Sequence, residues 1–241
     1  MTTASRRLIP VASFTVLMAT LAVAPVLVKS GSSDDAAPLE SSTPQATSAA
    51  GAATNADAST TEISPVAGDG SFVPVVQTKI DGKPTKLQLT GTAVRKAIGL
   101  KFYRIAGYCD VGHDPDDVDE LASADVPKQL ILVLERDIPE NVLRRSFQMA
   151  FDANDPEQKY TADITKLLDH VMAEPLKKGD QITLTHLPQT GVECRVGDDE
   201  PLRVPVPLFA HVVWNVYMGP KGVCPVLRAG LGKHLTPDAV Q

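Results

Sequence analysis

Residues 91–108 read GTAVRKAIGLKFYRIAGY. A glycine opens this segment, Arg95 follows shortly after it, and branched and aromatic side chains dominate from Leu100 to Tyr108. Side chains of these types favour a β-strand, so Leu100–Tyr108 is predicted to be one. The same pattern and the hairpin signal Asp81-Gly82-Lys83 predict further strands at Val73–Ile80, Lys86–Leu89, Gln129–Leu134, Gln181–Leu187 and Val192–Val196.

Three segments carry apolar residues at helical spacing. The first presents Leu143, Phe147, Ala150 and Phe151 on one face after Pro139, a residue suited to the first turn of a helix. The second repeats the spacing in Ile164, Leu167, Leu168, Val171 and Met172, and the third covers Leu208–Tyr217 and ends before Gly219-Pro220. The predicted order is therefore strands, then a pair of helices, then strands again. This order indicates the α+β fold class.

The first 70 residues differ in composition from the rest of the chain. Residues 8–28 are almost entirely apolar after Arg6 and Arg7, which predicts a signal anchor or a cleaved signal peptide over 1–29. Residues 30–70 lack aromatic and basic side chains, so they are predicted to form a disordered tether. One globular domain is then expected at 71–236, in an extracytoplasmic location, periplasmic or in the cell envelope, and either anchored to the membrane or secreted.

Composition and missing motifs exclude several function classes. The net charge is −6 without a basic cluster in the domain, which argues against nucleic acid as a partner. The sequence lacks the nucleophile elbow, the phosphate-binding loop, the dinucleotide fingerprint and the zincin motif. No cofactor or metal is therefore expected, and the acidic residues between Asp110 and Glu120 are interpreted as a solvated loop. Cys109, Cys194 and Cys224 leave two alternatives, one bridged pair or buried free thiols.

The segment at 91–108 resembles the chalcone isomerase-like family, in which a Gly-rich turn delivers an Arg and a K-x-Y-x-x-x-x-Y strand follows. In this sequence the pattern places Arg95 ahead of Lys101, Tyr103 and Tyr108. The resemblance continues in the same order through Leu130–Ile138, Lys178–Ile182, Pro188 with Gly191, and Trp214–Gly219.

The resemblance implies an open-faced β-sandwich, in which a large antiparallel sheet curls over a layer of helices and a ligand cleft lies between them. Some family members close a chalcone to a flavanone, and others look like fatty-acid-binding proteins. The family's ligand-facing Arg corresponds to Arg95, and its Tyr partner in the fatty-acid-binding branch corresponds to Tyr108. Tyr103 falls where the isomerases carry a catalytic Thr.

The first long helix departs from the isomerase pattern. Isomerases carry a Tyr and, seven residues later, an Asn there, whereas residues 141–151 contain no Tyr and lack the Asn at the second position. We therefore expect non-catalytic binding of a fatty acid or a similar apolar carboxylate, with Arg95, Tyr103 and Tyr108 as ligand-binding residues and no catalytic residue. The alternatives are an intramolecular lyase using Arg95 and Tyr103, and a module that docks on another envelope protein. The membrane is expected as a partner through the N-terminal segment.

Overall fold

The computed structural model describes residues 65–235. The signal segment predicted at 1–29, and the predicted tether up to residue 64, lie outside the described residues. The described chain begins at Pro65, ahead of the domain start predicted at residue 71, and Val66 pairs with Phe72 in an isolated β-bridge. Within this described range no helix has both the length and the apolar character needed to cross a bilayer.

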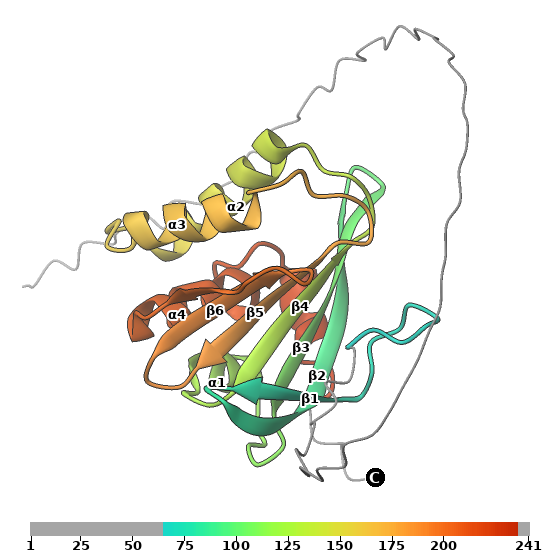
Figure 1. Ribbon diagram of the computed structural model, residues 1–241, viewed down its shortest axis with the longest axis vertical. Helices are drawn as coiled ribbons and strands as arrows, with labels where there is room; N and C mark the ends of the chain where they lie inside the picture. The colour runs from blue at the N-terminus through green and yellow to red at the C-terminus, as the bar shows by residue number, and fades with distance from the viewer. Residues whose placement is uncertain (1–64, 236–241) are drawn as a thin grey trace, which may run out of the picture. The chain divides into compact units, whose positions relative to one another are not determined.

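Seven antiparallel strands form one sheet, and their spatial order follows their order in the sequence (Figure 1). Strands that follow one another in the sequence therefore lie side by side, as an antiparallel sheet permits. The strands are β1 (Val75–Ile80), β2 (Lys83–Ala97), β3 (Leu100–Asp110), β4 (Lys128–Leu134), β5 (Gln181–Leu187), β6 (Gly191–Val196) and β7 (Leu202–Val204).

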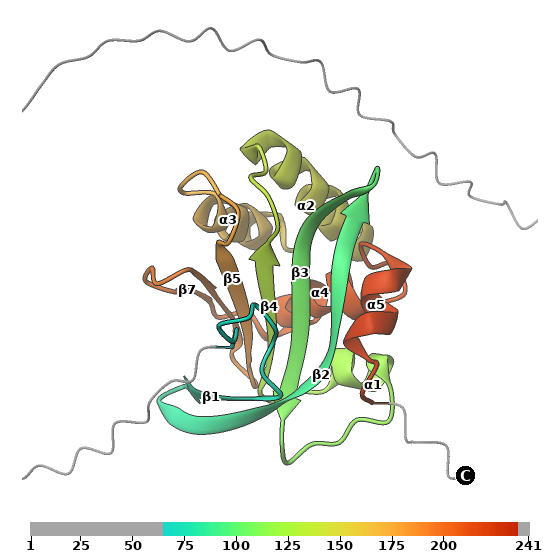
Figure 2. The same ribbon diagram turned by 90° about the vertical axis from the view of Figure 1, so that its right-hand side faces the viewer.

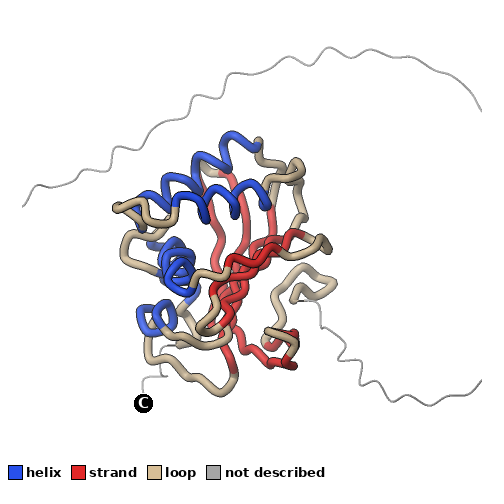
Figure 3. Tube along the Cα trace, turned by 60° about the vertical axis from the view of Figure 1, so that its left-hand side comes forward, coloured by secondary structure: helices blue, strands red, loops and turns tan. Residues whose placement is uncertain are grey.

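The helices cover one face of this sheet (Figure 3). They are α1 (Val118–Ser123), α2 (Glu140–Asn154), α3 (Thr161–Val171), α4 (Pro207–Met218) and α5 (Pro225–Leu231). The α2 face that enters the core consists of Leu143, Phe147, Ala150 and Phe151, the four residues that the spacing predicted. The arrangement confirms the predicted α+β open-faced β-sandwich.

Four elements were not predicted from the sequence. The predicted strand ended at Leu89, whereas residues 91–97 are the second half of the long strand β2. The other three are the short elements α1, β7 and α5. The acidic segment predicted as a loop includes α1, and Asp117 caps that helix by accepting hydrogen bonds from the backbone N–H groups of Asp119 and Glu120.

The sheet buries residues on both of its faces. The larger core lies between the sheet and the helices and takes Tyr103, Ile105 and Cys109 from β3. A smaller apolar cluster on the opposite face takes Ala106 and Tyr108 from the same strand. Successive side chains of a strand point to opposite faces, so Tyr103, Ile105 and Cys109 enter one core, and Ala106 and Tyr108 enter the other.

A β-bulge at Thr90 reverses this alternation within β2. Leu89 pairs with Tyr108, but Gly91 already pairs with Gly107, so Thr90 is an extra residue in β2. The helix α5 packs tightly on the strand beyond this bulge. A Cβ added to Gly91 would lie 2.1 Å from the Gly230 carbonyl oxygen, so only glycine allows this approach of the two backbones.

Candidate functional site

The bulge at Thr90 turns Arg95 toward the helix-covered face of the sheet. Before the bulge, Leu87 and Leu89 belong to the cluster on the open face. Beyond it, Ala93 packs against the helix-side core, and Arg95, two residues further along, faces the same way. The half-buried Arg95 guanidinium donates through Nη1 to the carbonyl oxygen of Lys96, 3.2 Å away, and no carboxylate between residues 65 and 235 pairs with it.

Tyr103 lies directly opposite Arg95 on the neighbouring strand β3. Its ring is buried in the helix-side core, and within the described chain its hydroxyl has no hydrogen-bond partner. Burial raises the pKa of Tyr103 well above its usual range, the nearby Arg95 charge acts to lower that pKa, and Cys224 acts to raise it. The phenol therefore stays protonated at physiological pH and remains available as a hydrogen-bond donor beside a guanidinium.

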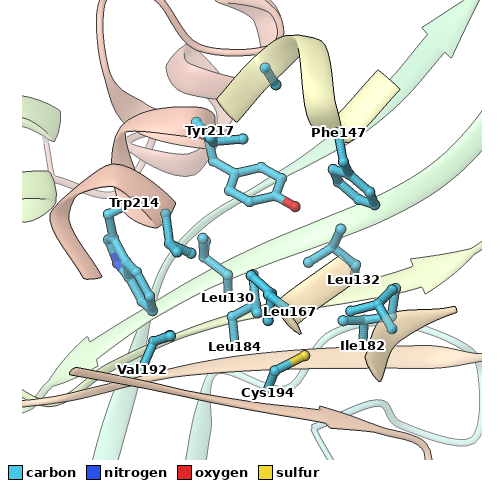
Figure 4. Packing of buried hydrophobic residues seen from close by; sticks show 14 of the residues in the cluster. Leu130, Leu132, Phe147, Leu167, Ile182, Leu184, Val192, Cys194, Trp214 and Tyr217 are labelled. Carbon is cyan, nitrogen blue, oxygen red and sulfur yellow. The ribbon is translucent and has the colours of Figure 1, made fainter. Parts of the chain in front are cut away.

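A second phenol, Tyr217, reaches the same region from α4. Figure 4 shows its hydroxyl oxygen turned toward Phe147, above the strands of the sheet. Burial raises the pKa of Tyr217 well above its usual range, and Tyr103 lies close enough to raise it further. Sequence reasoning missed this residue, although it is the one hydroxyl-bearing side chain of α4.

Apolar side chains surround these polar groups on the sheet and on the helices. Branched and aromatic residues from the central strands and from α2, α3 and α4 fill the space between the two layers (Figure 4). An acyl chain has to displace some of these side chains to enter, and it would then meet a lining of its own polarity. The labelled members are Leu130, Leu132, Phe147, Leu167, Ile182, Leu184, Val192, Cys194, Trp214 and Tyr217.

Tyr108 lies on the opposite face of the sheet from Arg95 and Tyr103. It is 1% exposed, and its hydroxyl donates to the carbonyl oxygen of Val73 at 2.9 Å. Arg104, on the same face, binds the carbonyl oxygen of Gly70 and lies over the ring of Phe72. These contacts hold the segment that precedes β1 against the sheet. The structure therefore does not bring Tyr108 and Arg95 together, because the bulge reverses the face of Arg95 but not that of Tyr108.

A polar cleft of about 350 Å³ lies on the open face between β1 and the strands β4, β5 and β6. Its lining is rich in hydrogen-bonding side chains, among which Gln129 donates to Thr185 at 3.0 Å and Gln181 to Thr183 at 3.2 Å. Charged side chains add two positive and two negative groups, from Lys79, Arg195, Glu193 and Asp198. This cleft suits water or a small polar molecule better than an acyl chain, because charged and hydrogen-bonding groups line it.

Another buried polar cluster lies under α1 and beside Trp214. The Lys128 ammonium group donates to the carbonyl oxygens of Leu121, Ala122 and Ala124 and thereby satisfies the C-terminal end of α1. Burial lowers the pKa of Lys128 to about 8. Its three carbonyl partners make this lysine a structural cap.

His186 belongs to the same cluster and is buried against Trp214. Its Nε2 lies 2.9 Å from the Asp125 carboxylate, and its Nδ1 is buried without a partner in the described chain. Burial lowers the pKa of His186, although the hydrogen bond with Asp125 acts to raise it. The three cysteines are free thiols, and Cys109 and Cys194 are buried.

Comparison with known families agrees with this architecture. The model of the chalcone isomerase-like family matches residues 74–232. The chain belongs to the chalcone isomerase-like family. The match begins at the residue before β1 and ends just after α5, so the family domain includes the whole sheet and all of the helices.

Among solved structures, the chain is similar to a fatty-acid binding protein from Arabidopsis thaliana. The two share 15% sequence identity with a TM-score of 0.53, and the similarity covers 70% of this chain and 96% of the plant protein. The comparison with curated proteins found no match. At this identity the similarity establishes a common chalcone isomerase-like fold and no more.

Proposed function

We propose that this chalcone isomerase-like domain binds a fatty acid or a similar apolar carboxylate between its sheet and its helix layer. The observation that carries the proposal is the pairing of Arg95 with Tyr103 at the margin of a large apolar core. A guanidinium and a neutral phenol together offer a carboxylate three or more donors, and the core supplies surface for the acyl chain. The plant fatty-acid binding protein of the same fold supports this choice of ligand.

The same geometry favours binding over catalysis. A tyrosine acts as a general base only when its pKa approaches the working pH, whereas burial raises that of Tyr103 away from it. The core face of α2 is formed by four apolar residues and offers no donor to orient a ketone. The lyase remains the alternative, and it would have to use Arg95 and Tyr103 without a base between them.

We also propose that the domain acts outside the cytoplasm. The support is the apolar segment 8–28 behind Arg6 and Arg7, which lies outside the described residues. A fusion of alkaline phosphatase to the end of the full chain would be active if the domain is exported and inactive if it stays in the cytoplasm.

Ligand extraction from natively purified protein tests the binding proposal. Organic extraction followed by mass spectrometry should recover an apolar acid in a reproducible ratio to protein. A fluorescent fatty acid should bind to the delipidated chain and be displaced by unlabelled acid. Consistent absence of both signals would refute the proposal, and conversion of a chalcone at a rate above that of heat-denatured protein would favour the lyase instead.

A further inference from the structure

The closed end of the β2–β3 hairpin projects past the rest of the sheet (Figure 2). Its two turn residues are Ile98 and Gly99, since Ala97 pairs with Leu100. Ile98 is 81% exposed and Leu100 is 48% exposed, although both are large apolar side chains. Exposed apolar groups at a projecting tip are typical of surfaces that meet a partner.

Ile98 also occupies a backbone conformation that its side chain disfavours. Its φ is 51° and that of Gly99 is 73°, which are the left-handed values of a two-residue hairpin turn. The β1–β2 turn has nearly the same angles at Asp81, 50°, and Gly82, 75°. Asp-Gly suits such a turn, whereas a β-branched residue in its first position is strained. Local stability alone would not select an isoleucine here.

Cations flank the apolar tip, and none of them is neutralised. Residues 95–101 contain Arg95, Lys96 and Lys101 and no acidic residue, although the chain as a whole carries a net charge of −6. Lys96 and Lys101 are direct cross-strand partners, an arrangement that repels. Throughout residues 65–235 no carboxylate forms an ion pair with either lysine. A negatively charged partner would relieve this repulsion.

We infer that the β2–β3 tip is a membrane contact that inserts Ile98 and Leu100 between the head groups of an anionic bilayer, where Lys96 and Lys101 meet lipid phosphates. Apolar side chains beside basic ones form the pattern that holds peripheral proteins at such a surface. A stable protein interface needs about 800 Å² from each partner. Two apolar residues on a narrow tip offer far less flat surface than that, which favours lipid over protein. This inference does not depend on the ligand proposed above.

Tryptophan substitution at the tip tests the contact in the full chain. The native Trp214 is 1% exposed, so its emission should not change on vesicle binding. The wild-type spectrum measures this emission, which is then subtracted from the spectra of the variants. Ile98→Trp places an indole at the tip, and Leu208→Trp is the matched control, because Leu208 is 64% exposed on α4. Both proteins are mixed with two kinds of vesicle, one of phosphatidylcholine alone and one of phosphatidylcholine with phosphatidylglycerol. The lipids of both vesicles carry brominated acyl chains, which quench tryptophan fluorescence.

The inference predicts a blue shift and several-fold stronger bromine quenching for Ile98→Trp than for Leu208→Trp, on phosphatidylglycerol vesicles only. This local readout is independent of any attachment through residues 8–28. Adding Lys96→Gln and Lys101→Gln should remove the effect, and raising the salt concentration should weaken it. Equal quenching at positions 98 and 208 would overturn the inference, as would no dependence on lipid charge. A blue shift that grows with protein concentration without vesicles would overturn it in favour of a protein contact.

The tip variants also need to be folded for this comparison. The circular dichroism spectrum and melting temperature of Ile98→Trp should match those of the wild type, because the position is exposed. With Leu100→Trp as the reporter, a further Ile98→Asn substitution should preserve folding and reduce the quenching at least twofold. Unchanged quenching in this folded double variant would show that Ile98 does not contribute to insertion and would overturn the proposed role of the tip.

Discussion

Arg95 and Tyr103 are direct cross-strand partners, and both side chains lie on the face of the sheet that the helices cover. The guanidinium is half-buried without a carboxylate partner in the described range, and the adjacent phenol stays protonated because burial raises its pKa. An unpaired cation beside a neutral donor, at the margin of an apolar core, is suited to receive the head of an apolar acid.

Removal of the Arg95 side chain should abolish most of the affinity for acids. We expect Arg95→Ala to cost about 2–5 kcal/mol of binding free energy, the range for truncating one partner of a buried charge pair. Arg95→Lys should restore only part of it, because an ammonium lacks the planar fork. Calorimetric titration with an acid and its methyl ester measures both effects, and the ester should bind wild type and Arg95→Ala about equally weakly.

Arg195 provides the matched control for that titration, because it is a half-buried arginine that lines the polar cleft on the opposite face. Arg195→Ala should leave acid affinity unchanged. If it lowered the affinity while Arg95→Ala did not, the acid would bind on the open face of the sheet and the site assignment would be wrong.

The two tyrosines of β3 should separate binding from stability. Tyr103→Phe removes a hydroxyl that has no partner within the described chain, so the melting temperature should change little. Acid affinity should fall by about 1.5–3 kcal/mol, the value of a hydrogen bond to a charged group. Tyr108→Phe removes the bond to Val73 and should lower the unfolding free energy by about 1 kcal/mol without changing affinity. Urea unfolding and titration of both variants check this, and a reversed pattern would restore Tyr108 as a ligand-binding residue.

Relief of the strained turn at Ile98 should stabilise the domain. Ile98→Asn places a residue that tolerates left-handed angles in a turn where φ is 51°, so the unfolding free energy should rise by about 1 kcal/mol. Ile98→Val keeps the β-branch and should leave stability unchanged. The measurement is the urea midpoint of each variant. A destabilised Ile98→Asn would mean that the tip contributes packing that its 81% exposure does not suggest.

Acid should destabilise the domain through His186. Burial lowers the pKa of His186 below the ordinary value of 6.5, and the nearby charges of Lys128 and His211 lower it further. The hydrogen bond with Asp125 acts in the opposite direction. Below pH 6.5 the unfolded chain therefore binds a proton that the folded chain still excludes, so the unfolding free energy falls with pH until the folded-state pKa is passed. The stability that neutral His186 contributes is thus complete above pH 6.5.

Urea unfolding between pH 7.5 and 5 measures this loss. In His186→Gln the curve should be flatter in that window, because the group that titrates there has been removed. His234→Gln, at an exposed histidine, should keep the slope of the wild type. An unchanged slope in His186→Gln would show that another group causes the loss.

Much of the architecture was predictable from neighbouring residues alone. The branched and aromatic composition of Leu100–Tyr108, the apolar runs of β4 and β5, and the helical spacing of Leu143, Phe147 and Phe151 all match the observed elements. The order of short motifs along the chain also predicted the family, which the match over residues 74–232 confirms. Short elements escaped prediction because α5, with seven residues, and β7, with three, are too short to show a period.

The face of the sheet on which each site residue lies could not be predicted from the sequence. Strict alternation from Leu87 and Leu89 would place Arg95 on the open face with Tyr108, as the predicted pairing required. The bulge at Thr90 moves Arg95 to the helix-covered face instead. That bulge lies where Gly91 and Gly230 bring the backbones of β2 and α5 into contact. Local residue patterns were sufficient to predict the longer strands and helices, and the order of short motifs was sufficient to predict the family. Which tyrosine accompanies Arg95 depends on contacts between distant parts of the chain, because one extra residue in a strand exchanges its two faces, and the bulge lies against a helix more than 130 residues further along the chain.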